Sequence, residues 1–255
     1  MKRVLSALLT ACVGLAALPT HGQVSVTSLG VAYTENFDTL SNTAGLTTAN
    51  LTNGWLMTES GGGARDNEQY AVAAGESNTG DTYSFGAAGS TERALGGLRS
   101  GTLIPVFGVQ FVNNTGVTIT SLDISYVGEM WRLGTAARTD RLDFQYSLDA
   151  VSLASGAWTD VTALGFSSPD IVTVGAKNGN LPAERTTVAA SINGLAVANG
   201  AVVTIRWTDV DASGADDGLA VDDFGLTAIP EPSTYALLFG VVALSLVIVG
   251  RRCRR

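Results

Sequence analysis

Hydrophobic and polar residues alternate along much of the middle of this 255-residue chain. The alternation is clearest in three segments with an apolar side chain at every second position: Leu122–Tyr126, Leu142–Tyr146 and Val203–Trp207. A period of two places these side chains on one face of a strand, so each segment is predicted to be a half-buried antiparallel strand. Turn-forming clusters lie between such segments: Asn113–Gly116, Lys177–Asn180, Asn199–Gly200 and Ser213–Ala215.

Between its two ends, the chain has no 11-residue stretch with the apolar stripe of an amphipathic helix. Glycine contributes 30 residues, and charged residues make up only 15%. This composition suits short strands joined by tight turns, because glycine adopts turn conformations that other residues avoid. We therefore predict an all-β fold of about ten to twelve short strands, a jelly-roll-like antiparallel β-sandwich over residues 23–228.

The N-terminal 22 residues have the pattern of a signal peptide. Met1–Arg3 is a short basic segment, Val4–Leu18 is apolar, and a helix-breaking segment of small residues then suits cleavage near Gly22. A lipoprotein is the alternative, because Leu9–Cys12 matches the motif that precedes a lipidated cysteine. The apolar run continues past that cysteine, however, where a lipoprotein becomes polar.

Residues 229–255 form a tail of three parts. Pro230, Glu231 and Pro232 come first, an apolar segment over 234–250 follows, and an arginine-rich segment over 251–255 ends the chain. The apolar segment, as a helix, spans about 25 Å at ~1.5 Å per residue, slightly less than a hydrocarbon core of about 30 Å. We predict a transmembrane helix over 234–250, with the arginines on the cytoplasmic side and residues 23–228 outside.

These three parts, in this order, resemble the PEP-CTERM sorting signal of Gram-negative bacteria. Such signals are recognised by a membrane protease-transpeptidase, the exosortase, in species that make extracellular polysaccharide. The resemblance implies that the helix anchors the protein in the inner membrane only transiently. It is then removed as the ectodomain, residues 23–228, passes to the cell surface or the medium. A plain single-pass anchor is the alternative that the pattern itself allows.

Segments of the ectodomain resemble those of exported bacterial proteins that carry such tails: Glu35–Asp38, Gly128–Arg132 and Asp217–Phe224. The last of them is similar to the closing strand of jelly-roll carbohydrate-binding and adhesion modules. This is a likeness of fold and implies no activity.

Charge is distributed unevenly along the chain. Residues 23–250 contain nine basic and all 23 acidic side chains, a net charge of −14 (9 − 23). Such a segment repels phosphate backbones, which argues against nucleic-acid partners and favours divalent cations or neutral ligands. Both cysteines, Cys12 and Cys253, and the single histidine, His21, lie in the targeting segments. The ectodomain therefore lacks the residues of a Ser-His-Asp triad, a cysteine nucleophile or a usual zinc site.

The densest group of acidic residues lies just before the last predicted strand. Asp209, Asp211 and Ser213 occupy alternate positions before Gly214, as in the first half of an EF-hand loop. The twelfth position of such a loop is Ala220 instead of the bidentate glutamate, and both flanks have the pattern of strands. The segment is therefore not an EF-hand.

A calcium site of another kind is our hypothesis here, because clustered carboxylates are costly without a cation. Terminal strands often pair in jelly rolls, which would bring acidic residues of the first and last strands together. The candidate calcium ligands are Asp209, Asp211, Ser213, Asp217, Asp222, Asp223, Glu35 and Asp38. The alternative is a solvated acidic turn.

The tryptophans offer a second kind of site, since flat apolar rings stack on sugar rings. Trp207 alternates with Val203 and Ile205 and is predicted to lie in the core. Trp55, Trp131 and Trp158 are candidates for glycan stacking, with burial in the core as the alternative.

Glu129 and Arg132 lie close together at the end of a predicted strand, where an ion pair between them is expected. A second carboxylate near Glu129 would give the acid and base of a glycoside hydrolase. Nothing in the spacing singles out such a pair among 23 acidic residues.

The sequence therefore predicts a non-catalytic cell-surface or extracellular-matrix protein. It is expected to be processed by exosortase, to associate with extracellular polysaccharide and to be stabilised by calcium. Two alternatives stay open at this point. One is a glycan-active hydrolase with paired carboxylates, and the other is a structural surface protein without a ligand.

Overall fold

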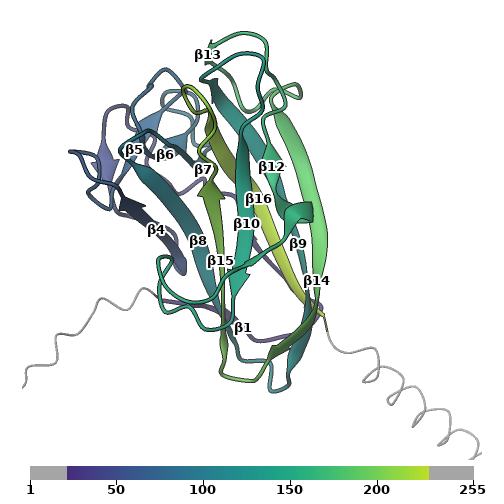
Figure 1. Cartoon of the computed structure of the whole chain (residues 1–255). Coiled ribbons are helices and arrows are strands. Elements are labelled where there is room, and N and C mark those ends of the chain that lie inside the picture. Colours follow the sequence, from purple (N-terminus) through teal and green to yellow (C-terminus); the bar gives the residue numbers. More distant parts are fainter. Residues whose placement is uncertain (1–21, 230–255) are drawn as a thin grey trace, which may run out of the picture.

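The computed structural model describes residues 22–229. They form two β-sheets that face one another and a single short 3₁₀ turn, η1 (Thr162–Leu164) (Figure 1). The predicted all-β class is therefore confirmed. Within the described residues, no helix has the length and apolarity needed to cross a membrane. The predicted signal peptide and sorting signal lie outside this part, apart from their boundary residues Gly22 and Ile229.

The first sheet, sheet A, is centred on two long neighbouring strands. Its strands follow the spatial order β1 (Val24–Val26), β8 (Ile104–Asn113), β15 (Val202–Asp209), β10 (Arg141–Ser147) and β11 (Thr159–Asp160). Two further strands pair at its edges: β4 (Trp55–Ser60) with β8, and β12 (Phe166–Ser167) with β10.

The second sheet, sheet B, is built around the two longest pairings of the molecule. Its order is β13 (Gly175–Ala176), β9 (Ile119–Leu133), β16 (Gly218–Ile229), β7 (Ala94–Leu98), β6 (Asp81–Phe85), β5 (Tyr70–Ala73) and β3 (Thr47–Thr48). In addition, β14 (Arg185–Val197) pairs with β9, and β2 (Ala32–Glu35) pairs with β16.

The pairing differs from the prediction in two respects. β1 runs parallel to β8 and β5 runs parallel to β6, so both sheets are mixed rather than purely antiparallel. The chain crosses over between Ala73 and Asp81 instead of turning back as a hairpin, which is why β5 and β6 run in the same direction. Residues 22–229 contain sixteen strands, more than predicted, because several strands have only two or three residues.

The main core lies between the two sheets and is centred on Trp207 of β15, whose exposed fraction is 0%. Phe107 and Phe144 of sheet A lie 5.7 and 5.2 Å from it, measured between ring centroids. Tyr126 and Phe224 of sheet B approach it to 5.5 and 5.8 Å, edge to face. Rings from both sheets thus close the sandwich, and the predicted core position of Trp207 is confirmed.

A second, smaller apolar cluster covers the other face of sheet B. It includes Tyr83 and Phe85 of β6, Trp131 of β9 and Ala220 of β16. The rings of Phe85 and Trp131 stack at 6.0 Å. Strands β5, β6 and β7 are consequently buried on both faces, and alternation disappears from their sequences.

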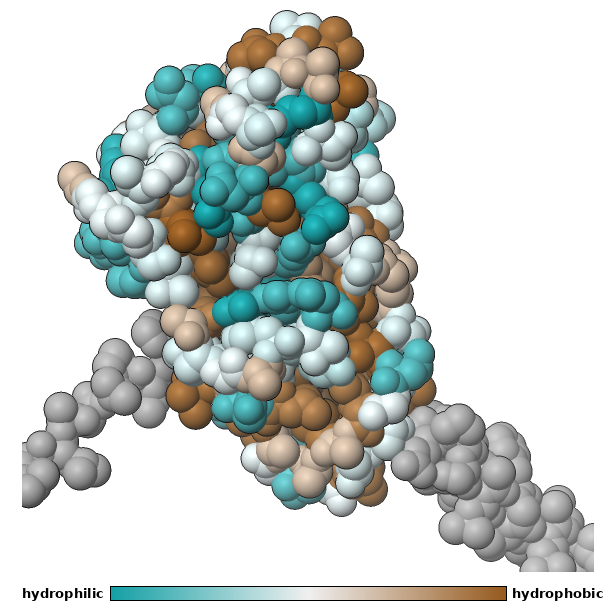
Figure 2. All heavy atoms as spheres, in the orientation of Figure 1, coloured by the Kyte–Doolittle hydropathy of each residue, from teal (hydrophilic) through white to brown (hydrophobic). Residues whose placement is uncertain are grey.

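The two ends of the sandwich differ. Near β1, the end of β16 lies beside the N-terminal part of the described chain, since the Gly30 amide donates a hydrogen bond to Ala228 O at 2.8 Å. The opposite end carries β13 (Figure 1). Just before β13, the apolar residues Ile171, Val172 and Val174 are exposed, and Figure 2 shows apolar side chains at this end.

Candidate metal centre

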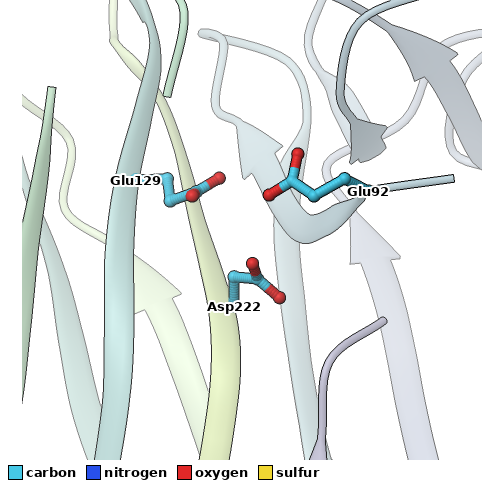
Figure 3. Close-up of side chains that lie close together, drawn as sticks. All are labelled: Glu92, Glu129 and Asp222. Carbon is cyan, nitrogen blue, oxygen red and sulfur yellow. The ribbon is translucent and has the colours of Figure 1, made fainter. Parts of the chain in front are cut away.

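Three carboxylates from three separate segments converge on the covered face of sheet B (Figure 3). They belong to Glu129 of β9, Asp222 of β16 and Glu92 of the loop between β6 and β7. One oxygen of each lies within 4.8 Å of one oxygen of both others. Within residues 22–229, this is the one group of three or more His, Cys, Asp or Glu side chains that meets this criterion. We call it the acidic triad.

The period of a strand explains how the triad forms. Glu129 lies two residues before Trp131, and Asp222 lies two residues after Ala220, so both carboxylates share the face that the small apolar cluster covers. β9 and β16 are neighbours, with Ala220 opposite Glu129 in the register. The loop that carries Glu92 then closes over this face from the direction of β7.

A second loop packs directly on the triad and removes it from water. A Cβ at Gly179 would lie 2.5 Å from Trp131 Nε1 and 3.0 Å from Glu129 Cβ, so only glycine fits there. Glu129 is 0% exposed and Asp222 is 5% exposed, whereas Glu92 is partly exposed. An ion can therefore reach the triad from the side of Glu92.

Burial and mutual repulsion make the triad electrostatically costly. Burial raises the pKa of Glu129 to about 7, with Trp131 opposing the shift and the negative charge of Glu92 adding to it. Burial also raises the pKa of Asp222 to about 8, opposed by the Asp223 amide and reinforced by Glu129. Both acids hold a proton more tightly than usual because the folded protein gives their charges little compensation.

The hydrogen bonds of the triad leave oxygens free. Trp131 Nε1 donates to Glu129 Oε2 at 3.0 Å, and the Asp223 amide donates to Asp222 Oδ1 at 2.7 Å. Glu129 Oε1 is buried without a hydrogen-bond partner. Asn180 Nδ2 donates to Glu92 Oε2, while Asn180 Oδ1 is also buried without a partner.

A β-bulge fixes the position of Asp222. The register of β16 against β9 shifts between Asp222 and Gly225, and Asp223 adopts a left-handed backbone with φ of +47°. Such a bulge redirects side chains at the point where it occurs. It places Asp222 on the triad and Asp223 on the exposed surface.

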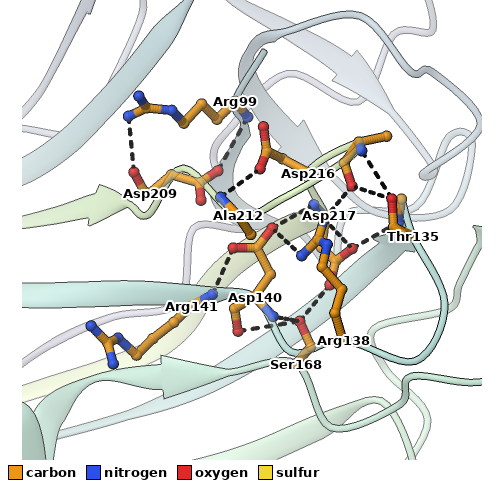
Figure 4. Close-up of polar contacts among 12 residues, drawn as sticks. Arg99, Thr135, Arg138, Asp140, Arg141, Ser168, Asp209, Ala212, Asp216 and Asp217 are labelled. Atoms are coloured by element: carbon orange, nitrogen blue, oxygen red, sulfur yellow. Dashed lines mark hydrogen bonds and ion pairs between the residues drawn. The ribbon is translucent and has the colours of Figure 1, made fainter. Parts of the chain in front are cut away.

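The predicted calcium loop has another structure. Its carboxylates are bound by arginines from distant parts of the chain (Figure 4). Asp209 Oδ2 accepts a hydrogen bond from the Arg99 amide at 3.1 Å, and Asp211 forms an ion pair with Arg99 Nη2 at 3.3 Å. Asp209 is 4% exposed, and burial raises its pKa well above the usual range. Ser213 is exposed.

Asp217 belongs to the same network, which we call the arginine network. Arg138 forms ion pairs with Asp140 at 3.1 Å and with Asp217 at 3.6 Å. Asp217 Oδ1 also accepts from the Gly134 amide at 2.7 Å, and Ser168 Oγ donates to Asp217 Oδ2 at 2.5 Å. Arg99 and Arg138 thus form ion pairs with three acids of this region, while Asp209 Oδ1 is buried without a hydrogen-bond partner. Calcium binding by this loop stays a prediction.

The predicted pairing of the first and last strands occurs, but it gathers a different set of acids. Glu35 lies opposite Phe224 in the register of β2 and β16. Its Oε1 accepts from the Phe37 amide at 2.8 Å, and Asp38 accepts from Asn36. The carboxylates grouped with Asp222 are those of Glu92 and Glu129, so the grouping with Glu35 or Asp38 was wrong.

The glycan-stacking prediction is wrong for two of its three tryptophans. Trp55 is 1% exposed and Trp131 is 2% exposed, because they pack in the main core and the small cluster respectively. Trp158 is half-buried, and the Arg206 guanidinium lies over its ring at 3.8 Å. One face of that ring is therefore covered.

The expected ion pair between Glu129 and Arg132 does not form. Side chains alternate between the two faces of a strand. Glu129 and Arg132 are three positions apart, so their side chains point to opposite faces. Arg132 Nη1 donates to the carbonyls of Gly75 and Glu76 instead.

Glu92, Arg99 and Arg138 were missed by sequence reasoning, because no local pattern links them to the groups they meet.

An open groove crosses the part of the outer face of sheet B that the small apolar cluster leaves uncovered. Strands β2, β9, β14 and β16 contribute to it, and its volume is about 440 Å³. The polar residues that line it are Thr34, Asp123, Ser125, Ser191, Asp223 and Thr227. Ser191 Oγ donates to Asp123 Oδ1 at 2.5 Å across β9 and β14. Small side chains such as Ala189 and Gly225 keep the groove open.

No protein-family model matches the chain, and no curated protein matches it. Among solved structures, the K2 cleaved adhesin domain of Lys-gingipain has a TM-score of 0.40 and 14% identity, over 77% of this chain and 97% of that one. A xylan-binding module, CBM15, has a TM-score of 0.36 and 13% identity, over 74% of this chain and 99% of that one.

The enzymatically active domain of tailspike protein 4 from bacteriophage CBA120 has a TM-score of 0.36 and 9% identity. The match covers 69% of this chain and 19% of the tailspike chain, so the present chain spans about a fifth of that protein. All three similarities are too remote to indicate a function.

Proposed function

We propose that this is an exported, non-catalytic surface or matrix protein that is sorted by an exosortase and associates with extracellular polysaccharide. The sorting part of the proposal is supported by the sequence tail: Pro230, Glu231 and Pro232, the apolar segment 234–250 and the arginines of 251–255. The export part is supported by the signal-peptide pattern of residues 1–22.

The finer fold assignment within this proposal is a jelly roll. It is supported by the order of the main strands, β7-β16-β9-β14 in sheet B and β8-β15-β10-β12 in sheet A. Two interlocked Greek keys place eight strands in this order. β8 and β9, like β15 and β16, are consecutive in the chain but lie in different sheets, as such a roll requires.

The observation that carries the polysaccharide-binding part is the groove of sheet B. It presents hydroxyl and carboxylate groups in the open, at the ends of short side chains that stand on a rigid sheet. Hydroxyl-rich chains are bound by such groups through multiple hydrogen bonds. An extended groove that crosses four strands also suits an extended ligand better than a compact one.

Hydrolysis is the less favoured alternative. Glu129 and Asp222 are two carboxylates whose raised pKa would suit acid catalysis, and both lie in the acidic triad. Their exposed fractions are 0% and 5%, so a sugar ring cannot lie between them without displacement of the loops above. The triad can accept an ion, but it has no room for a glycosidic bond.

Affinity electrophoresis in gels that contain the host's extracellular polysaccharide tests the proposal. We expect the purified full chain to be retarded, and the double variant Asp123→Ala/Ser191→Ala to lose most of the retardation because it removes two adjacent polar groups of the groove. Asp143→Ala is the matched control: it also removes a hydrogen-bonded strand carboxylate, but on sheet A. Equal migration of all three proteins with and without polysaccharide would rule out the proposed binding.

A further inference from the structure

We propose that Glu92, Glu129 and Asp222 bind one calcium ion. This inference does not depend on the proposed function, since the triad and the groove lie on different parts of the outer face of sheet B and involve different residues. The candidate ligands differ from the loop that the sequence suggested. They are assembled from two strands and a loop that lie up to 130 positions apart in the chain.

The charge of the triad is the first argument. Glu129 and Asp222 are buried and Glu92 is partly exposed, and three charged carboxylates within 4.8 Å of one another repel strongly in such a setting. In the arginine network, Arg99 and Arg138 form ion pairs with acidic side chains. The basic residue that acts on Glu129 is Arg185, which is exposed. A divalent cation would supply the missing positive charge inside the triad.

The unpartnered oxygens are the second, independent argument. Glu129 is completely buried, its Oε1 has no hydrogen-bond partner, and its carboxylate points towards Glu92 in Figure 3. A buried polar atom without a partner requires an explanation, and a bound ion or water is one. Asn180 Oδ1 is a second such atom, and its side chain already contacts Glu92. The site thus contains free oxygen donors beyond the three carboxylates.

The donor set and the spacing select the ion. All of these donors are oxygens, and the described residues 22–229 contain neither His nor Cys, so soft and borderline metals have no preferred ligand. Two oxygens on opposite sides of Ca²⁺, each at about 2.4 Å, lie about 4.8 Å apart. Mg²⁺ needs shorter bonds in a near-perfect octahedron and keeps most of its waters, which this closed setting does not favour.

Binding would link the loop that carries Glu92 to two strands that are already paired with each other. Asp222 and Glu129 belong to the central pair of sheet B, while Glu92 belongs to a loop. The ion would fix this loop and the loop of Asn180 over the small apolar cluster. We therefore expect calcium to stabilise the fold, at the affinity of about 10⁻⁴–10⁻³ M that is common in extracellular modules.

Terbium luminescence provides a direct test. Tb³⁺ replaces Ca²⁺ in oxygen sites and emits when a nearby indole is excited, and Trp131 Nε1 lies 3.0 Å from Glu129 Oε2. We expect the full chain, purified in mild detergent and stripped with EDTA, to show sensitised emission that saturates at one Tb³⁺ per chain. Ca²⁺ should displace it, while Mg²⁺ at the same concentration should not.

Variants assign the site. Glu129→Gln and Glu92→Gln should each weaken Ca²⁺ binding about tenfold or more, because each removes a charged ligand. Glu92 is partly exposed, so its variant keeps the test valid if Glu129→Gln does not fold. Two controls should bind as the wild type does: Asp209→Asn, a buried acid with an unpartnered oxygen in the arginine network, and Asp211→Asn in the predicted loop.

Two results would overturn the inference. One is the absence of saturable Ca²⁺ or Tb³⁺ binding by the wild type. The other is binding that Asp211→Asn weakens and Glu92→Gln leaves unchanged, which would place the ion in the 209–217 loop. Either result would leave the polysaccharide proposal untouched, because retardation in the gel is measured independently on the groove variant.

Discussion

At the scale of single residues, the molecule is unusual for the number of acidic side chains that it buries. Glu59, Asp81, Glu129, Asp209 and Asp217 are each 5% exposed or less. Burying a carboxylate is costly unless hydrogen bonds or a positive charge compensate it. Some of these carboxylates are paired with arginines and others only accept hydrogen bonds. The pH dependence of stability should reveal which buried carboxylates are least well compensated.

Asp81 of β6 provides a clear case. Its side chain is 0% exposed, its Oδ2 accepts from Arg65 at 3.0 Å, and its Oδ1 has no partner. Burial raises the pKa of Asp81 to about 7, the charge of Glu59 adds to the shift, and Arg65 opposes it. Between pH 4 and 7, the folded protein therefore keeps a proton that the unfolded chain has lost. The contribution of Asp81 to the stability of the folded protein therefore falls as the pH rises through this window.

Asp81→Asn should remove this part of the pH dependence. Relative to the wild type, we expect the variant to gain stability between pH 4 and pH 8, on the order of 3 kcal/mol. Urea unfolding of both proteins at several pH values measures the difference. Asp38→Asn, an exposed acid, is the control and should follow the wild type. A constant difference between Asp81→Asn and the wild type at all pH values would contradict the account.

At the scale of elements, the arginine network joins loops and strand ends of both sheets. Arg138 lies in the loop after β9, Asp140 precedes β10, and Asp217 precedes β16. The side chain of Arg138 is only 13% exposed, and those of Asp140 and Asp217 are 0% exposed. The network thus connects the ends of strands from both sheets at the pole opposite β1.

Arg138→Ala should destabilise the fold strongly, because it leaves two buried carboxylates without their cation. The expected loss is about 3–5 kcal/mol in the free energy of unfolding. The neighbouring Arg141→Ala removes an exposed ion pair with Asp143 and should cost about 1 kcal/mol or less. The double variant Arg138→Leu/Asp217→Asn should recover part of the loss. Equal effects of Arg138→Ala and Arg141→Ala in denaturant unfolding would show that the network contributes little.

The elements also show which features the sequence could predict. Alternation located β9, β10 and β15 and placed Trp207 in the core, because one face of each strand meets the opposite sheet. The same signal fails for β5–β7, because one face of these strands meets the main core and loops cover the small apolar cluster on the other face. Glu92 and Glu129 meet only because one of these loops folds back over β9, and no local pattern encodes such a contact.

The arginine network was unpredictable for a related reason. The 209–217 segment has the composition of a calcium loop, but composition does not reveal that Arg99 and Arg138 supply its counter-charge. A sequence pattern can identify a group of acids that needs compensation. Whether a cation or an arginine provides it depends on contacts between residues far apart in the chain.

At the scale of the whole molecule, the described domain begins and ends at one pole, where Gly30 is hydrogen-bonded to Ala228. Ser121 pairs with Ile229 at this pole, and Glu129 lies eight residues further along β9, roughly 26 Å away at about 3.3 Å per residue. In the proposed sorting, the C-terminal segment follows directly from this pole. The acidic triad and the arginine network would then face away from the membrane, with the groove of sheet B exposed along the side.

The location of the protein in its host tests the central claim most directly. Full-length protein would be followed by immunoblot in the cytoplasm, membranes, matrix and medium, before and after enzymatic removal of the extracellular polysaccharide. We predict a form in the matrix fraction that lacks the tail 229–255 and is released when the polysaccharide is removed. Protein that remains in the cytoplasm, or that stays in the membrane at full length regardless of the polysaccharide, would contradict the account.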